Sequence, residues 1–198
     1  MKDIEKIERG LFVIDMVNGF VREGAMADPS IAGIIPEVGK LVEEFLKNGD
    51  GVFFIKDAHE KDCAEFKRYP NHCIKETNEA RLVDELIPYE KYATRVYEKN
   101  STSAIFAPGL LSDLAKMNNL KELVGVGCCT DICVTNFLIP AQNYFDENNK
   151  SVCITVPKNA VETYDAPFHK RDEYNEMAFK LMNQAGVSLV KRYERRGK

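Results

Sequence analysis

The chain has 198 residues, of which 44% are hydrophobic and 29% are charged, a balance typical of a soluble globular protein. Its formal net charge of −4 argues against a nucleic-acid-binding surface. The first residues are charged, unlike a signal peptide, and no apolar run approaches the roughly 20 residues that span a bilayer. We therefore expect a cytoplasmic protein that binds neither nucleic acid nor membranes, with its six cysteines reduced.

Short apolar segments alternate with amphipathic segments along the chain. Residues 11–15 are almost wholly apolar and predict a strand buried on both faces, whereas residues 34–48 have the apolar spacing of a helix. The elements expected next are a strand at 51–57, a helix at 78–86, a strand at 93–97, a helix at 109–117, a strand at 122–127, a helix from about 132 to 147, a strand at 151–156, a helix at 172–185 and a strand at 187–191. This alternation predicts one α/β domain over residues 1–198, with a parallel sheet between helices.

Several polar residues follow the predicted strands. Asp15 and Asp57 end the first two strands, Lys99 follows the third, and the segment 127–133 follows the fourth. In open α/β sheets, ligands bind beyond the carboxyl ends of the strands. We therefore expect these residues, far apart in the sequence, to meet at one edge of the sheet.

Cys133 is a candidate nucleophile, because it follows a predicted strand and lies in the first turn of a predicted helix. Unpaired N–H groups and the helix dipole at such a position favour a thiolate and predict a lowered thiol pKa. The same N–H groups can stabilise an oxyanion. The alternative is that Cys133 is a small buried apolar residue, as single cysteines often are.

The other candidates also have structural alternatives. Asp15 at the end of an apolar strand is either a structural hydrogen-bond acceptor or a desolvated base, and Lys99 alone is typical of a surface lysine. His59 and His72 lie close in sequence to Asp57 and Glu65, a donor set that suits zinc, manganese or iron(II). These four polar side chains are alternatively hydrogen-bonded to one another within a long loop.

Four sequence blocks resemble the isochorismatase-like cysteine hydrolases, and among them most closely the nicotinamidases, across roughly residues 10–160. The blocks are Leu11-Phe-Val-Ile-Asp-Met-Val-Asn-Gly-Phe20, Asp57-Ala-His59 with Tyr69-Pro-Asn-His-Cys73, Glu98-Lys99 with residues 103–106, and Gly127-Cys-Cys-Thr-Asp-Ile-Cys-Val134. The resemblance implies a doubly wound, mainly parallel sheet of six strands. It also implies a cis peptide bond between Cys128 and Cys129.

The resemblance assigns roles to individual residues. It implies a catalytic triad of Asp15, Lys99 and Cys133, and an oxyanion site at the backbone N–H groups of Cys129 and Cys133. The implied ligands of one divalent metal ion, zinc or alternatively manganese or iron, are Asp57, His59, Glu65 and His72. The implied aromatic residues around a substrate ring are Phe20, Tyr69 and Phe106.

The activity that the resemblance implies is hydrolysis of nicotinamide to nicotinate and ammonia through a Cys133 thioester, a step of NAD salvage. Isochorismatases proper lack the nucleophilic cysteine, so Cys133 argues against that activity. Gly19 replaces an acid that many members carry, which leaves another small amide or carbamoyl substrate open. A redox-sensing or ligand-binding protein of the same fold is a further alternative. Family members assemble into oligomers, so we expect a homo-oligomer that binds a small-molecule amide.

Overall fold

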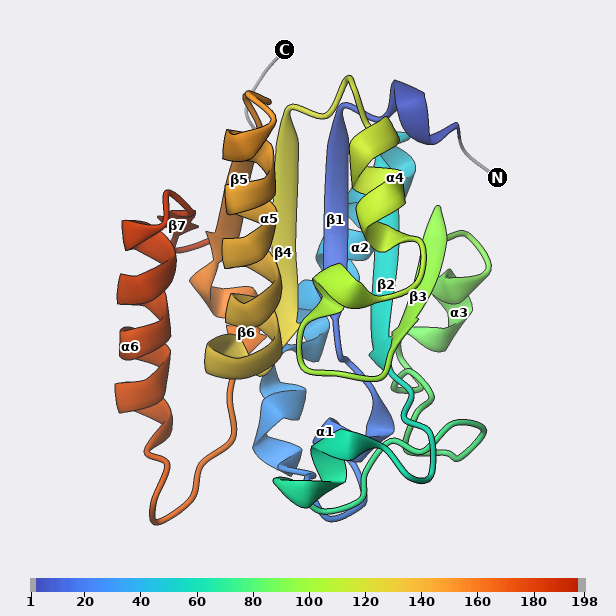
Figure 1. Cartoon of the computed structure of the whole chain (residues 1–198), viewed down its shortest axis with the longest axis vertical. Coiled ribbons are helices and arrows are strands. Elements are labelled where there is room, and N and C mark those ends of the chain that lie inside the picture. Colours follow the sequence, from blue (N-terminus) through green and yellow to red (C-terminus); the bar gives the residue numbers. More distant parts are fainter. Residues whose placement is uncertain (1–2, 196–198) are drawn as a thin grey trace.

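The computed structural model describes residues 3–195 and shows one sheet whose strands are all parallel. The strands are β1 (Arg9–Ile14), β2 (Gly51–Asp57), β3 (Arg95–Lys99), β4 (Glu122–Cys128), β5 (Cys153–Pro157), β6 (Val161–Glu162) and β7 (Ser188–Val190). Their order is β3-β2-β1-β4-β5-β7, and β6 pairs with the end of β4 (Figure 1). The predicted parallel α/β fold is confirmed, and the strand beyond the expected six is the two-residue β6.

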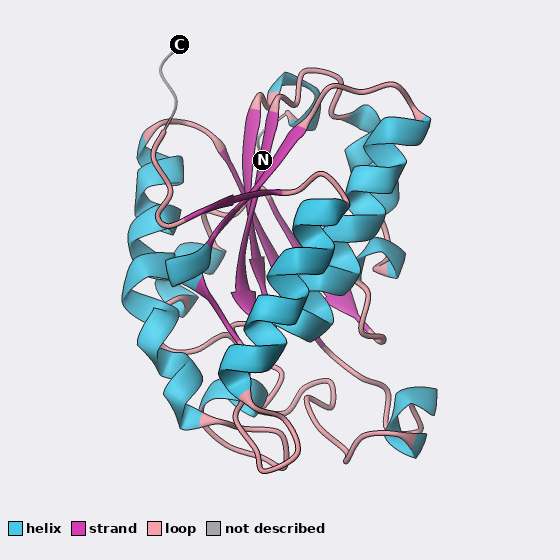
Figure 2. Ribbon diagram, turned by 90° about the vertical axis from the view of Figure 1, so that its left-hand side faces the viewer, coloured by secondary structure: helices cyan, strands magenta, loops and turns pink. Residues whose placement is uncertain are grey.

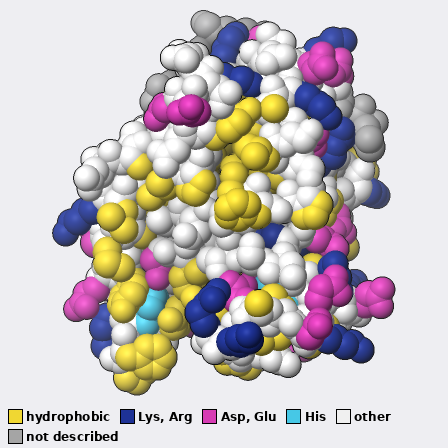
Figure 3. Space-filling view, in the orientation of Figure 1, with side chains coloured by type: hydrophobic (Ala, Val, Ile, Leu, Met, Phe, Trp, Pro, Cys, Tyr) yellow, Lys and Arg dark blue, Asp and Glu magenta, His cyan; other side chains and the backbone are white. Residues whose placement is uncertain are grey.

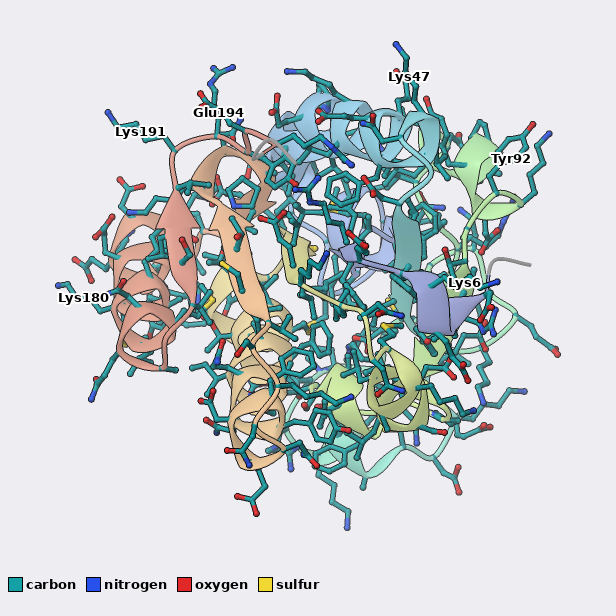
Figure 4. The ribbon with its side chains drawn as sticks, turned by 90° about the horizontal axis from the view of Figure 1, so that it is seen from above. Lys6, Lys47, Tyr92, Lys180, Lys191 and Glu194 are labelled. Carbon is teal, nitrogen blue, oxygen red and sulfur yellow. The ribbon has the colours of Figure 1, made fainter. Side chains whose placement is uncertain are left out.

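Helices cover both faces of the sheet (Figure 2). They are α1 (Asn18–Val21), α2 (Ile35–Lys47), α3 (Ile87–Glu90), α4 (Leu110–Lys116), α5 (Thr135–Glu147) and α6 (Arg171–Gln184). Seen from above in Figure 4, α2 lies on one side of the strands, and α5 and α4 lie on the other, with labelled residues such as Lys47 and Lys180 pointing outward. Among residues 3–195, no helix combines the length and the apolar composition needed to cross a membrane.

The two faces of the sheet have separate hydrophobic cores. Phe12 and Ile14 of β1 pack with residues of α4, α5 and α6, whereas Leu11 and Val13 pack with residues of α2. Successive side chains of a strand point to opposite faces, so a strand covered on both faces must be apolar at every position. This explains why the central strands are continuous apolar runs.

The prediction of a helix at residues 78–86 is wrong. This segment forms turns, and the short helix α3 begins only after it. Its backbone pairs instead with residues 16–19, which follow β1 and include the start of α1: Gly19 N–H donates to Glu79 O, Asn18 N–H to Arg81 O, and Val83 N–H to Met16 O. The apolar side chains of the segment are buried by this pairing, so tertiary contacts outweigh its local helical spacing.

Gly127 near the end of β4 has no room for a side chain. Its φ is +114°, and a Cβ atom there would lie 2.0 Å from the carbonyl oxygen of Ile14 on β1. We expect Gly127→Ala to lower the free energy of unfolding by at least about 3 kcal/mol, because it combines backbone strain with a backbone clash. Gly39→Ala in α2 is the matched control, since a Cβ atom there has nothing within 4 Å, and it should stabilise the protein slightly. Equal urea midpoints for the two variants would contradict the prediction.

Candidate active site

The carboxyl ends of four neighbouring strands bring the candidate residues together. Asp15 directly follows β1, and its N–H donates to Ile55 O on β2 over 2.9 Å. Asp57 and Lys99 are the last residues of β2 and β3 and are aligned with each other in the sheet. The chain then passes from β4 into the turn that carries Cys133. The convergence expected from the parallel topology is therefore present at the lower end of the strands in Figure 1.

Lys99 is the centre of a buried charged cluster. Its Nζ lies 2.8 Å from Asp15 Oδ2 and 3.6 Å from Cys133 Sγ, and it donates a hydrogen bond to Asp57 Oδ1. All four side chains are buried. Ligand atoms of Asp15, Asp57 and Cys133 lie within 4.8 Å of one another. Buried charged groups are stable only when they are paired. Lys99 therefore also stabilises the folded site, because it is the cation that neutralises the buried carboxylates.

The cluster sets the charge of its members. Burial raises the pKa of the Asp15 carboxyl to about 6, and repulsion from Asp57 adds to this effect. Burial also acts to raise the pKa of Asp57, but the Lys99 ammonium, together with His59 and His72, holds it below its ordinary range. Burial opposes the charge on Lys99, but the two carboxylates outweigh it and hold the pKa of Lys99 above its ordinary range. At neutral pH, Asp15 is thus an ionised carboxylate that can accept a proton.

The expected lowering of the Cys133 pKa is wrong. Burial raises the pKa of this thiol well above its ordinary range, and the Asp15 and Asp57 carboxylates add to the rise, against the opposing effect of Lys99. The sequence indicated a helix terminus but not the depth of the side chain or the two carboxylates facing it. The resting thiol therefore keeps its proton until a base removes it.

The turn that carries Cys133 has an unusual backbone. The Cys128–Cys129 peptide bond is cis, as the resemblance implied. Residues 130–134 form a π-helical turn, in which Val134 N–H donates to Cys129 O over 3.1 Å, and the turn continues into α5. The nucleophile candidate thus lies in a separate turn before α5 rather than in the first turn of a single long helix.

Three of the four expected metal ligands form a compact group beside this cluster. Ligand atoms of Asp57, His59 and His72 lie within 4.8 Å of one another. Asp57 Oδ2 is 3.5 Å from His59 Nε2 and 3.7 Å from His72 Nε2. Glu65 approaches from another side, with Oε2 at 3.6 Å from His59 Nε2, while its Oε1 accepts hydrogen bonds from the backbone N–H and the hydroxyl of Thr102.

The hydrogen bonds of the two histidines suit a metal ion. His72 Nδ1 lies 2.7 Å from Pro70 O and His59 Nδ1 lies 3.3 Å from Asn100 Oδ1, both of which only accept protons. The acceptors beside each Nδ1 favour a proton on that nitrogen, which leaves each Nε2, next to Asp57, as the nitrogen that can coordinate a cation. His59 Nε2 is buried without a hydrogen-bond partner. Two imidazole nitrogens and one carboxylate in a compact group match the donor set of a divalent cation held by histidine and aspartate.

The expectation from sequence missed one neighbour of this group. Cys63 Sγ lies 3.4 Å from His59 Nδ1 and 3.4 Å from Asn100 O. The sequence indicated only a loop cysteine, although its spacing of four residues after His59 is a signal that could have linked the two.

A pocket with a volume of about 920 Å³ opens over both clusters. Its lining includes Phe20, Tyr69, His72 and Cys133. In Figure 3 histidine side chains are visible at this lower end of the molecule. A pocket of this volume is in the range of small-molecule sites.

Phe106 is not part of the pocket. Its neighbours Ala104 and Ile105 are buried in the core, whereas the Phe106 side chain is 78% exposed and does not line the cavity. The expectation that it forms a wall around the substrate ring is corrected, because the short 3-10 turn at 104–106 directs it to the surface. Tyr164, which the sequence did not indicate, does line the pocket.

Comparisons with known proteins agree with this arrangement. A model of the isochorismatase domain matches residues 9–192. Nicotinamidase 1 of Arabidopsis thaliana is 30% identical over 200 residues, which cover 92% of this chain and 82% of that protein. The crystal structure of nicotinamidase PncA from Bacillus subtilis is 30% identical, with a TM-score of 0.78 over 93% of this chain and 99% of that chain. Pyrazinamidase of Pyrococcus horikoshii in complex with zinc is 22% identical, with a TM-score of 0.73 over 93% and 99% of the two chains, and shares the fold.

Proposed function

The chain belongs to the isochorismatase family, and we propose that it is a cysteine amidohydrolase that converts nicotinamide to nicotinate and ammonia. The observation that carries the proposal is the buried contact of Lys99 with both Asp15 and Cys133 beneath the pocket. A carboxylate with a pKa of about 6 beside a protonated thiol is a base placed next to its nucleophile. A nicotinamidase of this kind serves NAD salvage.

The first half of the proposed reaction forms a thioester. Asp15 takes the proton of Cys133, and the thiolate sulfur forms a bond to the carboxamide carbon. The carbonyl oxygen becomes an oxyanion, for which the backbone N–H groups of Cys129 and Cys133 are the proposed donors. When the oxyanion collapses, the C–N bond breaks, and the protonated Asp15 gives its proton to the departing nitrogen, which leaves as ammonia.

The second half releases the acid. Asp15, again a carboxylate, takes a proton from a water molecule, and the resulting hydroxide attacks the thioester carbon. The C–S bond breaks, and the sulfur of Cys133 recovers the proton from Asp15. Lys99 keeps Asp15 oriented through its 2.8 Å contact, and its positive charge favours each thiolate and carboxylate that the cycle requires.

The proposed metal ligands are Asp57, His59 and His72, with Glu65 as the fourth. These residues would hold a divalent ion, which would offer a coordination position to the ring nitrogen of the substrate. Phe20 and Tyr69 line the same pocket and offer aromatic surfaces to the ring.

Ammonia release from nicotinamide by the purified protein tests the proposal. We expect release, and we expect a chelator to lower the rate by more than about tenfold, with zinc, manganese or iron restoring it. A variant with both His59→Ala and His72→Ala should lose bound metal in elemental analysis, whatever the substrate. Release from another small amide or carbamoyl compound but not from nicotinamide would replace the proposed substrate and keep the hydrolase. A labelled Cys133 with no amidase activity would favour a redox-sensing or ligand-binding protein.

The pKa of Asp15 predicts the acidic limb of the pH profile. Asp15 acts as a base only when it is ionised, so kcat/KM should fall as the pH drops through about 6. The fall should approach tenfold per pH unit on the acidic side. Initial rates in buffers of constant ionic strength measure it, with circular dichroism at each pH as the control for unfolding. A flat profile down to pH values well below the Asp15 pKa would remove Asp15 from its proposed role.

A further inference from the structure

His169 is a buried imidazole beside the pocket that the proposed reaction does not use. It is 4% exposed, and its ring lies between the rings of Tyr164 and Tyr174. The ring centroids are 3.8 Å and 3.6 Å apart, with interplanar angles of 12° and 27°. This close stacking on both faces holds the imidazole in one orientation.

The ring is directed at the turn that carries the nucleophile. Asp131 lies two residues before Cys133 in that turn, and both of its carboxylate oxygens contact the segment 163–169. Oδ1 accepts a hydrogen bond of 2.5 Å from the Thr163 hydroxyl, and Oδ2 lies 2.9 Å from His169 Nε2. Both oxygens of the Asp131 carboxylate are therefore in contact with this segment.

The other ring nitrogen of His169 also faces an acceptor. His169 Nδ1 lies 3.0 Å from Tyr164 O, and a carbonyl oxygen only accepts protons. His169 therefore has an acceptor oxygen within hydrogen-bond distance of each ring nitrogen, and its ring lies between Tyr164 O of its own segment and Asp131.

The segment that His169 belongs to is a wall of the pocket. The cavity that Cys133 lines is also lined by Tyr164, Asp165 and Phe168 of this segment and by Arg171, the first residue of α6. Arg171 Nη2 lies 2.8 Å from Asp28 Oδ2, which also accepts a hydrogen bond from the Asp165 N–H over 2.9 Å. The residues of this wall are thus hydrogen-bonded to Asp28 on one side of the pocket and to Asp131 on the other.

We propose that His169 is a positioning residue, which holds the turn of Cys133 through Asp131 and so keeps the nucleophile aligned with Asp15. The proposal rests on the hydrolase function proposed above. The backbone of the turn also carries the proposed oxyanion donors, so a displaced Asp131 disturbs the attacking sulfur and the donors together. We therefore expect the loss of His169 to lower kcat, which depends on the chemical step, more than it changes substrate binding.

The test compares His169→Ala with the unaltered protein in two assays. We expect kcat for ammonia release to fall about 10- to 100-fold, the range for residues that orient a reacting group, with KM changed less than about threefold. Alkylation of Cys133 by iodoacetamide, followed by peptide mass spectrometry, should slow as well. Imidazole added at millimolar concentration should enter the space between the two tyrosines and restore part of both rates, which a lost structural residue would not allow.

A double-variant cycle and a surface control complete the experiment. If His169 acts through Asp131, the variant Asp131→Asn with His169→Ala should be no slower than Asp131→Asn alone. Glu173→Gln, an exposed change on α6, should match the unaltered protein in both assays. Additive losses, or losses in His169→Ala that imidazole leaves unchanged, would overturn the proposal. If the unaltered protein does not hydrolyse nicotinamide, the proposed substrate fails separately, and the Cys133 alkylation rates still decide the role of His169.

Discussion

Replacing Cys133 by alanine should abolish ammonia release while nicotinamide binding persists. The covalent route needs the sulfur as nucleophile, and removing a member of a catalytic triad typically lowers kcat by at least about 10³-fold. Binding should remain because the pocket walls and the metal ligands are separate side chains. Initial-rate assays measure the first quantity, and equilibrium dialysis with labelled nicotinamide measures the second.

Two further variants make the Cys133 result specific. Cys153→Ala removes a cysteine on β5, outside the pocket lining, and should keep the activity. Asp15→Asn should lose turnover to a similar degree, because the amide cannot accept the thiol proton. If Cys133→Ala kept even a tenth of the original rate, hydrolysis would proceed without the thioester, and the mechanism would have to be abandoned.

Replacing Lys99 by methionine should give the largest loss of stability among changes at the site. The change leaves the carboxylates of Asp15 and Asp57 buried together without their shared cation. Removing one partner of a buried ion pair costs about 3–5 kcal/mol, chiefly because the remaining charge has no partner. Part of this cost is relieved by protonation of Asp15, so the loss should be greatest at alkaline pH. Urea unfolding at several pH values measures it.

Lys56→Met is the matched control for Lys99. Lys56 lies on the neighbouring strand β2, is 13% exposed, and pairs with Glu90 at 3.0 Å and Glu98 at 3.7 Å near the surface. Its replacement should cost less than about 1 kcal/mol, since ion pairs near water contribute little. Asp15→Asn should also be milder than Lys99→Met, because it leaves the pair of Lys99 and Asp57 intact. Equal losses of unfolding free energy in the two lysine variants would show that Lys99 does not stabilise the fold through its pairing with the buried carboxylates.

The sequence predicted most of the fold because the central strands are continuous apolar runs separated by amphipathic helices. A parallel sheet then requires all carboxyl ends to meet at one edge, which predicts that Asp15, Asp57 and Lys99 lie near the turn of Cys133. β3 ends at Lys99, two residues later than expected, so this lysine belongs to the strand itself. The resemblance to known hydrolases added the metal ligands, of which Asp57, His59 and His72 form one group.

Other features depended on contacts that no local pattern encodes. The segment 78–86 has helical spacing, but its backbone is hydrogen-bonded to residues 16–19 after β1. Phe106 is aromatic in a matching block, but the direction of its side chain follows from the packing of its two neighbours. His169 lies 38 residues from Asp131, so their contact exists only in the folded chain.

By itself, the sequence determined the parallel α/β architecture and the edge of the sheet at which the polar residues gather, because strand periodicity and chain order are local properties. Only the tertiary structure decided the protonation states within that site. The pKa of Cys133 is raised rather than lowered, because burial and facing carboxylates outweigh the helix terminus and Lys99. The pKa of a side chain depends on its desolvation and on charges brought close from distant parts of the chain, and both arise only on folding.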